Sequence, residues 1–184
     1  MDWIDEAGVT LKSLPRAEIR RLNLLHRVTG TLVFHPNGRI FVHRRTDAKD
    51  VYPGLYDMAV GGTVASGESY TENACRELAE ELGVRGIPLY WLFSHRFQDP
   101  SSNSLTEVFA CVTEGPFLLQ HEEIAEGSWR HPDAVAELIA TNRVCPDSAQ
   151  TWRLFCEQTG EQGNLLDRIT ADSLRPVDCA GRQP

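Results

Sequence analysis

The sequence predicts an α/β fold of the α+β kind, in which a mixed β-sheet is sandwiched between α-helices. Segments with the composition of strands alternate with segments that have the composition of helices, and strand pairs joined by short polar turns occur among them. One helical segment also carries an apolar stripe on a single face, as a helix packed on a sheet does. Because hairpins place their strands antiparallel, the sheet is expected to be mixed rather than purely parallel.

The first half of the chain is expected to contain two hairpins, one helix and one short strand. Pro15 stands at the favoured first position of a helix, and Asn37-Gly38 accepts the positive φ angles of a tight hairpin turn. Pro53-Gly54 indicates a loop over 46–55. The elements in order are a small hairpin over 2–12, a helix over 16–24, strands over 28–34 and 39–43, and a short strand over 57–60.

The second half begins with the helix that bears the apolar stripe. Its residues Ala74, Leu78 and Leu82 recur every four positions, and Gly83 is where such a helix would end. Two later segments are rich in aromatic and β-branched residues, which is typical of strands. The expected elements are a helix over 69–82, strands over 87–97 and 105–112, a short strand over 124–129, and helices over 132–140 and 147–158.

One domain is expected to span residues 1–160, with residues 1–24 as an N-terminal hairpin and helix extension. The chain has 184 residues, of which 41% are hydrophobic and 24% are charged, and this is sufficient for one sizeable core. After Gly160 the apolar periodicity is lost. Residues 161–184 are therefore expected to form a C-terminal tail.

Composition narrows the setting and the partners of the protein. No apolar run approaches the roughly 20 residues that span a bilayer, and the N-terminus is acidic, so a cytoplasmic protein without membrane contact is expected. The net charge of −8 argues against nucleic acid as a partner. The five cysteines form no C-x-x-C pair and are expected to be reduced thiols.

Three glutamates of the central helix are spaced so that they share one face. Glu77, Glu80 and Glu81 stand at positions i, i+3 and i+4, so their carboxylates repel one another unless a cation lies between them. Hard divalent cations accept such oxygens, which predicts a Mg²⁺ site, with Mn²⁺ as the alternative ion. Gly61 lets the backbone come close to the ion, and its carbonyl is a further expected ligand. The competing interpretation is a solvated, glutamate-rich helix face.

The residues around these glutamates match a longer pattern. The chain fits G-x5-E-x7-R-E-U-x-E-E-x-G-U, where U is aliphatic, at Gly62, Glu68, Arg76, Glu77, Leu78, Glu80, Glu81, Gly83 and Val84. An unrelated chain of this length matches it with a probability on the order of one in ten million. The pattern resembles the signature box of the Nudix hydrolases, which implies a Nudix fold. Within it, Arg76 is expected to pair with Glu77, and Glu68 to brace the loop at the helix start.

The resemblance implies metal-assisted hydrolysis of a diphosphate linkage in a nucleoside diphosphate derivative or a nucleotide. Bound Mg²⁺ neutralises charge in the transition state and lowers the pKa of an attacking water, and a general base takes the proton. In the family this base is a glutamate of the box or of a later loop. Of the later candidates Glu122, Glu123 and Glu126 we favour Glu123, with a charged rim as its alternative role. The expected catalytic residues are thus Glu77, Arg76 and Glu123.

Outside the box, three runs are similar to the Nudix branch that includes isopentenyl diphosphate isomerase. These runs are residues 24–27, 43–50 and 52–57. When the chains are aligned on residues 67–69, the cysteine of the isomerase falls on Gly61 and its adjoining metal-binding histidine falls on Thr63. A carbon-proton transfer needs a positioned acid and base, so hydrolysis is favoured over isomerisation. A non-catalytic ligand-binding or sensor protein is the other alternative.

Cations near the box are expected to bind the outer phosphate of the substrate. Arg44 and Arg45 alternate on a strand, so one of them, or Lys49, is expected to bind phosphate while the other arginine is solvated. Tyr52, Tyr56 and Phe97 are candidates to stack on a nucleobase, with a core or rim position as the alternative. The expected partner is a small-molecule diphosphate. Relatives often form homodimers, but no sequence feature specifies an interface.

Overall fold

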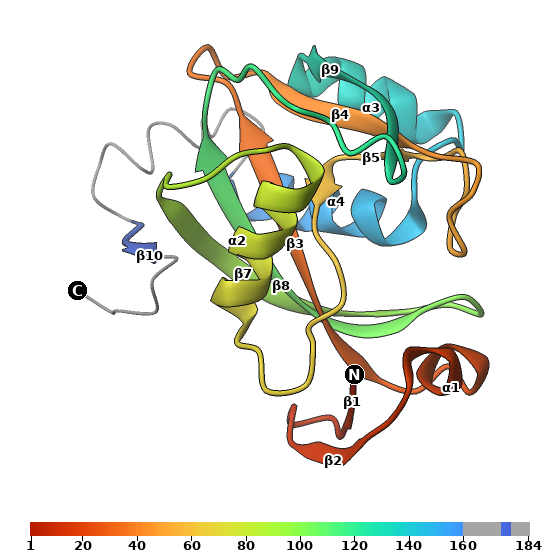
Figure 1. The fold of residues 1–184 in the computed structure, drawn as a ribbon. Helices are drawn as coiled ribbons and strands as arrows, with labels where there is room; N and C mark the ends of the chain where they lie inside the picture. Colours follow the sequence, from red (N-terminus) through yellow and green to blue (C-terminus); the bar gives the residue numbers. More distant parts are fainter. Residues whose placement is uncertain (160–173, 178–184) are drawn as a thin grey trace.

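The computed structural model describes residues 1–159 and 174–177, which fold as a curved sheet with helices on both faces (Figure 1). The elements in chain order are β1 (Asp2–Ile4), β2 (Thr10–Ser13), α1 (Arg16–Arg21), β3 (His26–Phe34), β4 (Ile40–Arg45), β5 (Tyr56–Asp57), β6 (Ala59–Val60), α2 (Tyr70–Glu81), β7 (Leu89–Gln98), β8 (Asn103–Val112), β9 (Ile124–Arg130), α3 (Pro132–Ala140), α4 (Pro146–Thr159) and β10 (Pro176–Val177). No helix in the described part of the chain is long and apolar enough to cross a membrane.

A long central strand, β3, organises the sheet. It pairs in parallel with β8 along its whole length, from His26↔Ser104 to Phe34↔Val112. The other pairings between these strands are antiparallel, and the main path runs β10-β7-β8-β3-β1-β2. The sheet is therefore mixed, as predicted, and β1 and β2 form the predicted N-terminal hairpin.

The predicted hairpin of β3 and β4 forms only at its turn. Gly38 adopts φ +84° there, and Phe34↔Ile40 is the one residue pair that joins the two described strands. Farther along, β6 occupies the edge of β3, so β4 diverges and pairs with β5 and β9. The short strand expected over 57–60 is thus two strands, β5 and β6, which lead the chain from β4 to the loop before α2.

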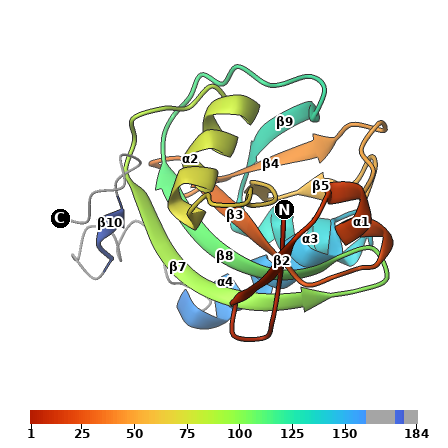
Figure 2. The same cartoon turned by 60° about the horizontal axis from the view of Figure 1, so that its bottom comes forward.

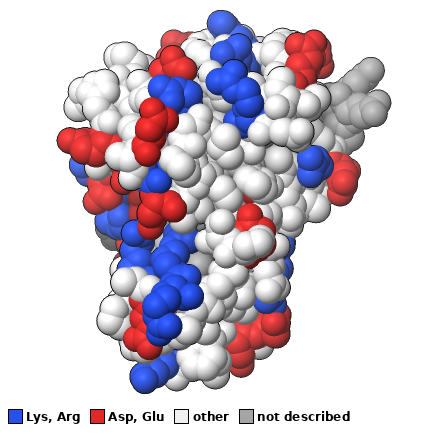
Figure 3. Space-filling model, turned by 90° about the vertical axis from the view of Figure 1, so that its right-hand side faces the viewer, with Lys and Arg blue, Asp and Glu red and all other residues white. Residues whose placement is uncertain are grey.

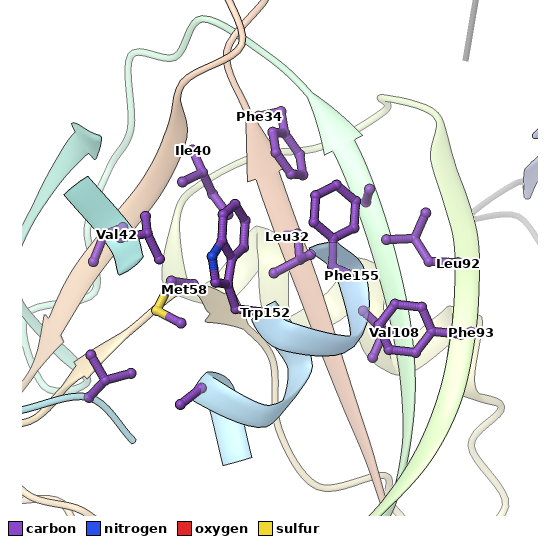
Figure 4. Close-up of a cluster of buried hydrophobic side chains, with 14 residues drawn as sticks. Leu32, Phe34, Ile40, Val42, Met58, Leu92, Phe93, Val108, Trp152 and Phe155 are labelled. Atoms are coloured by element: carbon purple, nitrogen blue, oxygen red, sulfur yellow. The ribbon is translucent and has the colours of Figure 1, made fainter. Parts of the chain in front are cut away.

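Helix α4 packs on one face of the sheet. Its Trp152 and Phe155 are buried and point toward Leu32 and Phe34 of β3 (Figure 4). The ring centroids of Phe34 and Phe155 lie 5.4 Å apart. Burial of each such side chain contributes about 1.5–3 kcal/mol, so this cluster fixes α4, and the polar residues at its start, against the sheet.

Helix α2 packs on the other face of the sheet. Its predicted stripe of Ala74, Leu78 and Leu82 is at most 2% exposed and joins a second buried cluster with Val33 and Phe109. Figure 2 shows α2 lying over the sheet while α1 stands apart from it near the N-terminus. Since the apolar stripe faces the sheet, the glutamates of α2 lie to the side of it, toward the loop that precedes the helix.

Part of the expected C-terminal tail is attached to the sheet. Strand β10 pairs antiparallel with β7 through Pro176↔Tyr90 and Val177↔Leu89. An edge strand such as β7 offers unpaired backbone groups to any extended segment, and a two-residue strand has no periodicity by which the sequence could reveal it. The remainder of the tail, 160–173 and 178–184, lies outside the described residues.

The cysteines differ from the expectation at one position. Cys75, on α2, is disulfide-bonded, so the expectation of a reduced thiol is wrong there. Cys111 and Cys145 are free thiols, as expected, and Cys179 lies outside the described residues. Cysteine connectivity is not encoded in local spacing, so this bond could not be predicted from the sequence.

Candidate active site

Helix α2 is fixed at both ends. Ser69 Oγ accepts a hydrogen bond from the Glu72 N–H at 3.2 Å, and the Glu72 carboxylate accepts one from the Ser69 N–H at 2.9 Å. These bonds satisfy N–H groups that a helix start leaves open. At the other end, Gly83 adopts φ +70°, which lets the Val84 N–H donate back to the Leu78 carbonyl at 3.1 Å. The face that bears the glutamates is therefore held in a defined orientation.

Arg76 contacts three carboxylates at once. Its Nε donates to Glu68 Oε1 at 2.9 Å, and one terminal nitrogen lies 2.9 Å from Glu77 Oε1 and 2.8 Å from Glu80 Oε2. Glu68 also accepts a hydrogen bond from the Ala65 N–H at 2.9 Å. Burial favours the protonated form of Glu68, but the hydrogen bonds from Arg76 and Ala65 outweigh burial and hold its pKa at about 2. The loop before α2 is thereby tied to the helix.

Glu77 and Glu81 are the recessed members of the carboxylate face. The side chain of Glu77 is 14% exposed and Glu81 is 7% exposed, whereas the side chain of Glu80 is 50% exposed. Burial and the nearby charge of Glu77 raise the pKa of Glu81 to about 8. Burial also raises the pKa of Glu77, despite the opposing charge of Arg76. A cation would stabilise the ionised forms of these two neighbouring carboxylates.

The donors fit a magnesium ion held by few protein ligands. Residues 1–159 and 174–177 contain no group of three histidine, cysteine or acidic side chains gathered at one point for a metal. Magnesium ordinarily takes one or two carboxylates and completes its shell with water and phosphate oxygens. The hard oxygens of Glu77 and Glu81, recessed on one helix face, meet this requirement.

Gly61 and Gly62 bring the backbone into contact with groups that a side chain would displace. A Cβ on Gly61 would lie 2.1 Å from the Thr29 carbonyl oxygen, and a Cβ on Gly62 would lie 2.7 Å from Glu77 Oε1. The Gly62 carbonyl accepts a hydrogen bond from the Thr29 N–H at 2.9 Å. Position 61 therefore requires glycine, because the clash is with backbone atoms, and a side chain at position 62 would displace the Glu77 carboxylate. The cysteine that the isomerase reaction would need at position 61 does not fit this backbone.

A cleft of about 700 Å³ opens at the carboxylate face. It brings together residues from α2, from the loop after β6, from the segment that follows β4 and from the loop before β9. The expected site residues that line it are Gly61, Gly62, Arg76, Glu77, Glu80, Glu81, Arg45, Lys49 and Glu123. Glu68 and Gly83 are outside its lining, and they act on the shape of the loop and the helix instead.

Lys49 and Glu123 form an ion pair in the wall of this cleft. The side chain of Lys49 is 18% exposed and that of Glu123 is 33% exposed. Burial, followed by the neighbouring charge of Arg45, lowers the pKa of Lys49. The favoured general-base candidate therefore has an ammonium group as its immediate partner, and Glu122 lies beside it in the lining.

The two arginines of β4 face opposite sides, as their alternation predicts. Arg45 lines the cleft, donates to the Val51 carbonyl at 3.2 and 3.1 Å and lies 3.6 Å from Asp57 Oδ2. Arg44 is outside the lining and pairs with Asp47 at 3.4 Å and with Glu126 at 3.2 Å.

Of the aromatic candidates, Tyr52 lines the cleft, whereas Tyr56 and Phe97 are outside its described lining. Tyr52 donates to Asp99 at 2.7 Å. Tyr56 donates to Glu126 at 3.4 Å, and the Arg143 guanidinium lies 5.4 Å from the centre of its ring. Tyr56 is half-buried and packs against the core cluster on the α4 side of the sheet, outside the cleft lining.

Five charged residues that the sequence did not indicate also line the cleft. Arg16 and Arg20 come from α1, Asp50 from the segment after β4, Asp57 from β5 and Asp147 from the start of α4. Sequence periodicity shows where a helix forms but not which distant element it faces. These residues meet only because the sheet brings α1, β5 and α4 to the same cavity.

Comparison with models of known protein families identifies the family of this chain. The family model for the NUDIX domain matches residues 24–149, the range that contains β3 to the start of α4 and the complete box. The chain belongs to the Nudix family. The resemblance inferred from the box is thus confirmed. Residues 1–23, with β1, β2 and α1, precede the matched range.

Similar Nudix proteins come from several bacteria. The chain is 42% identical over 155 residues to the uncharacterized Nudix hydrolase PA4841 of Pseudomonas aeruginosa, which covers 84% of this chain and 92% of that one. It is 32% identical over 163 residues to the Nudix hydrolase YfcD of Escherichia coli K12, covering 87% and 89% of the two chains. Its fold resembles the crystal structure of DR0079 from Deinococcus radiodurans, with a TM-score of 0.73, 26% identity and coverage of 83% and 96%.

This Nudix chain is an enzyme of the hydrolase class. Hydrolysis of pyrophosphate bonds in small molecules is the general activity of the family, and every fixed position of the box is present in this sequence. The Nudix fold, with its mixed sheet between helices, confirms the expected fold class.

Proposed function

We propose that this Nudix hydrolase uses Mg²⁺, or Mn²⁺ in its place, to cleave the diphosphate linkage of a nucleoside diphosphate derivative or a nucleotide. One observation carries the proposal. The recessed carboxylates Glu77 and Glu81 line the same cleft as the cations Arg45 and Lys49. A diphosphate brought into this cleft meets metal-binding oxygens on one side and positive side chains on the other.

Glu77 and Glu81 would hold the ion, with the half-exposed Glu80 and the Gly61 carbonyl as further ligands. When bound, the ion neutralises phosphate charge and lowers the pKa of the attacking water. Arg76 acts as a positioning residue because it fixes Glu77 and Glu80 through contacts of 2.9 and 2.8 Å. A change at Arg76 is therefore expected to displace metal ligands rather than to remove a group that touches the substrate.

Arg45 and Lys49 would bind the phosphate oxygens. The guanidinium of Arg45 is held by Val51 and Asp57, so its orientation is set before the substrate arrives, and charge-assisted bonds to phosphate are stronger than neutral ones. Lys49 is paired with Glu123. When the Lys49 ammonium turns to a phosphate, the Glu123 carboxylate is released and can accept the proton of the attacking water.

The test is a panel of diphosphates incubated with the purified protein in Mg²⁺. The panel contains nucleoside diphosphate sugars, nucleoside triphosphates, dinucleotides and isopentenyl diphosphate, and the products are separated and identified by chromatography with mass detection. The proposal predicts two phosphate-containing products from at least one nucleoside substrate, and no reaction in EDTA. Two results would overturn the proposal. One is that none of the nucleotide substrates in the panel is cleaved, and the other is that isopentenyl diphosphate is isomerised without phosphate release.

A further inference from the structure

The cleft extends beyond the box to the N-terminal helix. Arg16 and Arg20 of α1 line it together with Arg45 and Lys49. Figures 1 and 2 show α1 and α2 apart from each other in both views, so the cavity spans two separate helices. Because the family match begins at residue 24, α1 is an addition to the matched domain that contributes charge to its cleft.

Arg20 is the arginine of this group that forms no ion pair in the described part of the chain, although the charges of Asp50 and Asp147 act on its pKa. Its Nε is buried without a hydrogen-bond partner. The other arginines are each matched by a carboxylate, since Arg16 lies 3.0 Å from Asp50 and Arg45 lies 3.6 Å from Asp57. Burial, followed by the charge of Arg16, lowers the pKa of Arg20, as expected for a guanidinium taken from water without compensation.

The nearby acid does not cancel this charge fully. Asp147 is recessed in the same cleft, where burial and the neighbouring carboxylate of Asp57 raise its pKa. The ionised form of Asp147 is therefore disfavoured, which weakens its attraction for Arg20. Figure 3 shows lysine and arginine side chains in the lower half of the molecule's right-hand face, where Figure 1 places α1, with acidic side chains among them.

Arg20 lines the cleft from α1, whereas the carboxylates of the box line it from α2. The main charges that act on the pKa of Glu81 include Lys49 and Arg45 but not Arg20, and those that act on the pKa of Arg20 include no glutamate of the box. A ligand whose diphosphate occupies the box end would reach Arg20 only with a remote part of its structure.

We propose that Arg20, assisted by Arg16, binds a second phosphate group of the substrate, remote from the diphosphate that is cleaved. The inference rests on the proposed function. A phosphate monoester suits the site because it carries up to two charges and three accepting oxygens, which the planar forks of two guanidiniums can engage together. The enzyme would then prefer diphosphates that carry an additional phosphate monoester.

Matched ligand pairs test this preference. NADP⁺ and NAD⁺ differ by one phosphate monoester, as do coenzyme A and dephospho-coenzyme A, and all four contain a diphosphate. Affinities are measured by calorimetry in Mg²⁺ with the Glu77→Gln variant, so that turnover does not interfere. In at least one pair the phosphorylated member is expected to bind about tenfold tighter, the scale of a charge-assisted contact.

The role of Arg20 is assigned by variants on this background. Arg20→Ala should bring the ratio of affinities in that pair close to one. Arg20→Lys should give an intermediate ratio, because lysine keeps the positive charge but lacks the paired N–H donors of the guanidinium. Arg21→Ala is the matched control, since Arg21 is an exposed arginine of the same helix outside the cleft lining, and it should keep the full ratio. Circular dichroism establishes that each variant is folded.

Equal affinities in both pairs, no binding of any of the four ligands, or a preference that survives Arg20→Ala would each overturn the inference. Hydrolysis of the same ligands by the unaltered enzyme is measured separately. A phosphate preference without hydrolysis of any diphosphate would contradict the proposed function and leave the Arg20 site supported. Hydrolysis without a preference for the phosphorylated ligands would support the proposed function and contradict the Arg20 site.

Discussion

Arg76 Nε donates to Glu68 Oε1 at 2.9 Å, and this bond joins the helix of the box to the loop that precedes it. The side chain of Glu68 is 15% exposed and makes no contribution to the cleft lining among the described residues. The contacts of Glu68 with Arg76 and the loop explain why the pattern requires a glutamate at this position. The glutamate holds the loop, and the loop holds Gly62 beside Glu77.

The first prediction follows from that bond. Glu68→Ala should lower the free energy of unfolding by about 1–3 kcal/mol, because charged hydrogen bonds of a partly buried carboxylate are lost. It should also lower kcat/KM at least tenfold, because Arg76 and the metal ligands that it fixes lose their support. Denaturant unfolding and steady-state kinetics measure the two effects. Glu137→Ala, at an exposed site on α3, is the control, and equal behaviour of the two variants would refute the role of Glu68.

The second prediction concerns the backbone contact of Gly61. Gly61→Ala should destabilise the protein by about 3 kcal/mol, because the new Cβ would lie 2.1 Å from a backbone oxygen of β3 and that strand is held in the sheet. Gly86→Ala is a useful comparison, since its φ of +68° is strained in alanine but no atom lies within 4 Å of the new Cβ, and its cost should be about 1 kcal/mol. Thermal unfolding of both variants gives the order. A smaller effect at position 61 than at position 86 would show that the loop is not packed as described.

The third prediction separates the two arginines of β4. Arg45→Ala should lower kcat/KM at least tenfold, because a phosphate-binding cation is removed from the cleft. Arg44→Ala should change it less than about threefold, since Arg44 pairs with Asp47 and Glu126 outside the lining and exposed ion pairs contribute little. Kinetics on the best substrate of the panel decide the matter. The reverse order would place the phosphate on the opposite side of the strand.

The fourth prediction is that two buried histidines lower the stability of the folded protein in mild acid. Burial lowers the pKa values of His26 and His43 to about 4, while a histidine in the unfolded chain titrates near 6.5. At these two positions the unfolded chain therefore binds more protons between pH 6.5 and 4, so the histidines lower the stability of the folded state as the pH falls through this window, whereas the raised pKa values of Glu81 and Asp147 act in the opposite sense. Each histidine contributes on the order of 3 kcal/mol to this loss.

Denaturant unfolding at intervals of pH measures the slope. His43→Leu should reduce it, because His43 is 2% exposed and its Nδ1 has no hydrogen-bond partner in the structure, so the apolar residue removes a proton-binding site at little structural cost. An unchanged slope in this variant would indicate that His43 is protonated in the folded state.

The local features of the fold could be predicted because local chemistry determines them. Helix α2 follows from the stripe of Ala74, Leu78 and Leu82, and the turn before β4 follows from Asn37-Gly38. The parallel pairing of β3 with β8 could not be predicted, because it joins residues more than 70 positions apart and parallel strands carry no turn signal. The same limit explains why the pairing of β4 with β9 was not expected.

The candidate site also has one part that could be predicted from the sequence and one part that could not. The glutamates of the box share a helix face, so their spacing alone placed them together, and the cleft contains all three. Arg20 gave no signal, because an arginine on a short helix is usually solvated. Only the folded chain shows that it lines the cleft and forms no ion pair among the described residues. Lys49 and Glu123 were each identified as candidates, but their pairing depends on two loops that meet in space.

The most direct test of the account is the turnover number of Glu81→Gln at saturating Mg²⁺ on the best substrate of the panel. Glutamine keeps the shape of the side chain and removes the charge that the ion requires, so kcat should fall by about 10² to 10⁴-fold, while Glu137→Gln should retain the activity of the unaltered enzyme. A Glu81→Gln variant that is folded and turns over within about threefold of the unaltered enzyme would contradict the assignment of the carboxylate face of α2 to the chemistry.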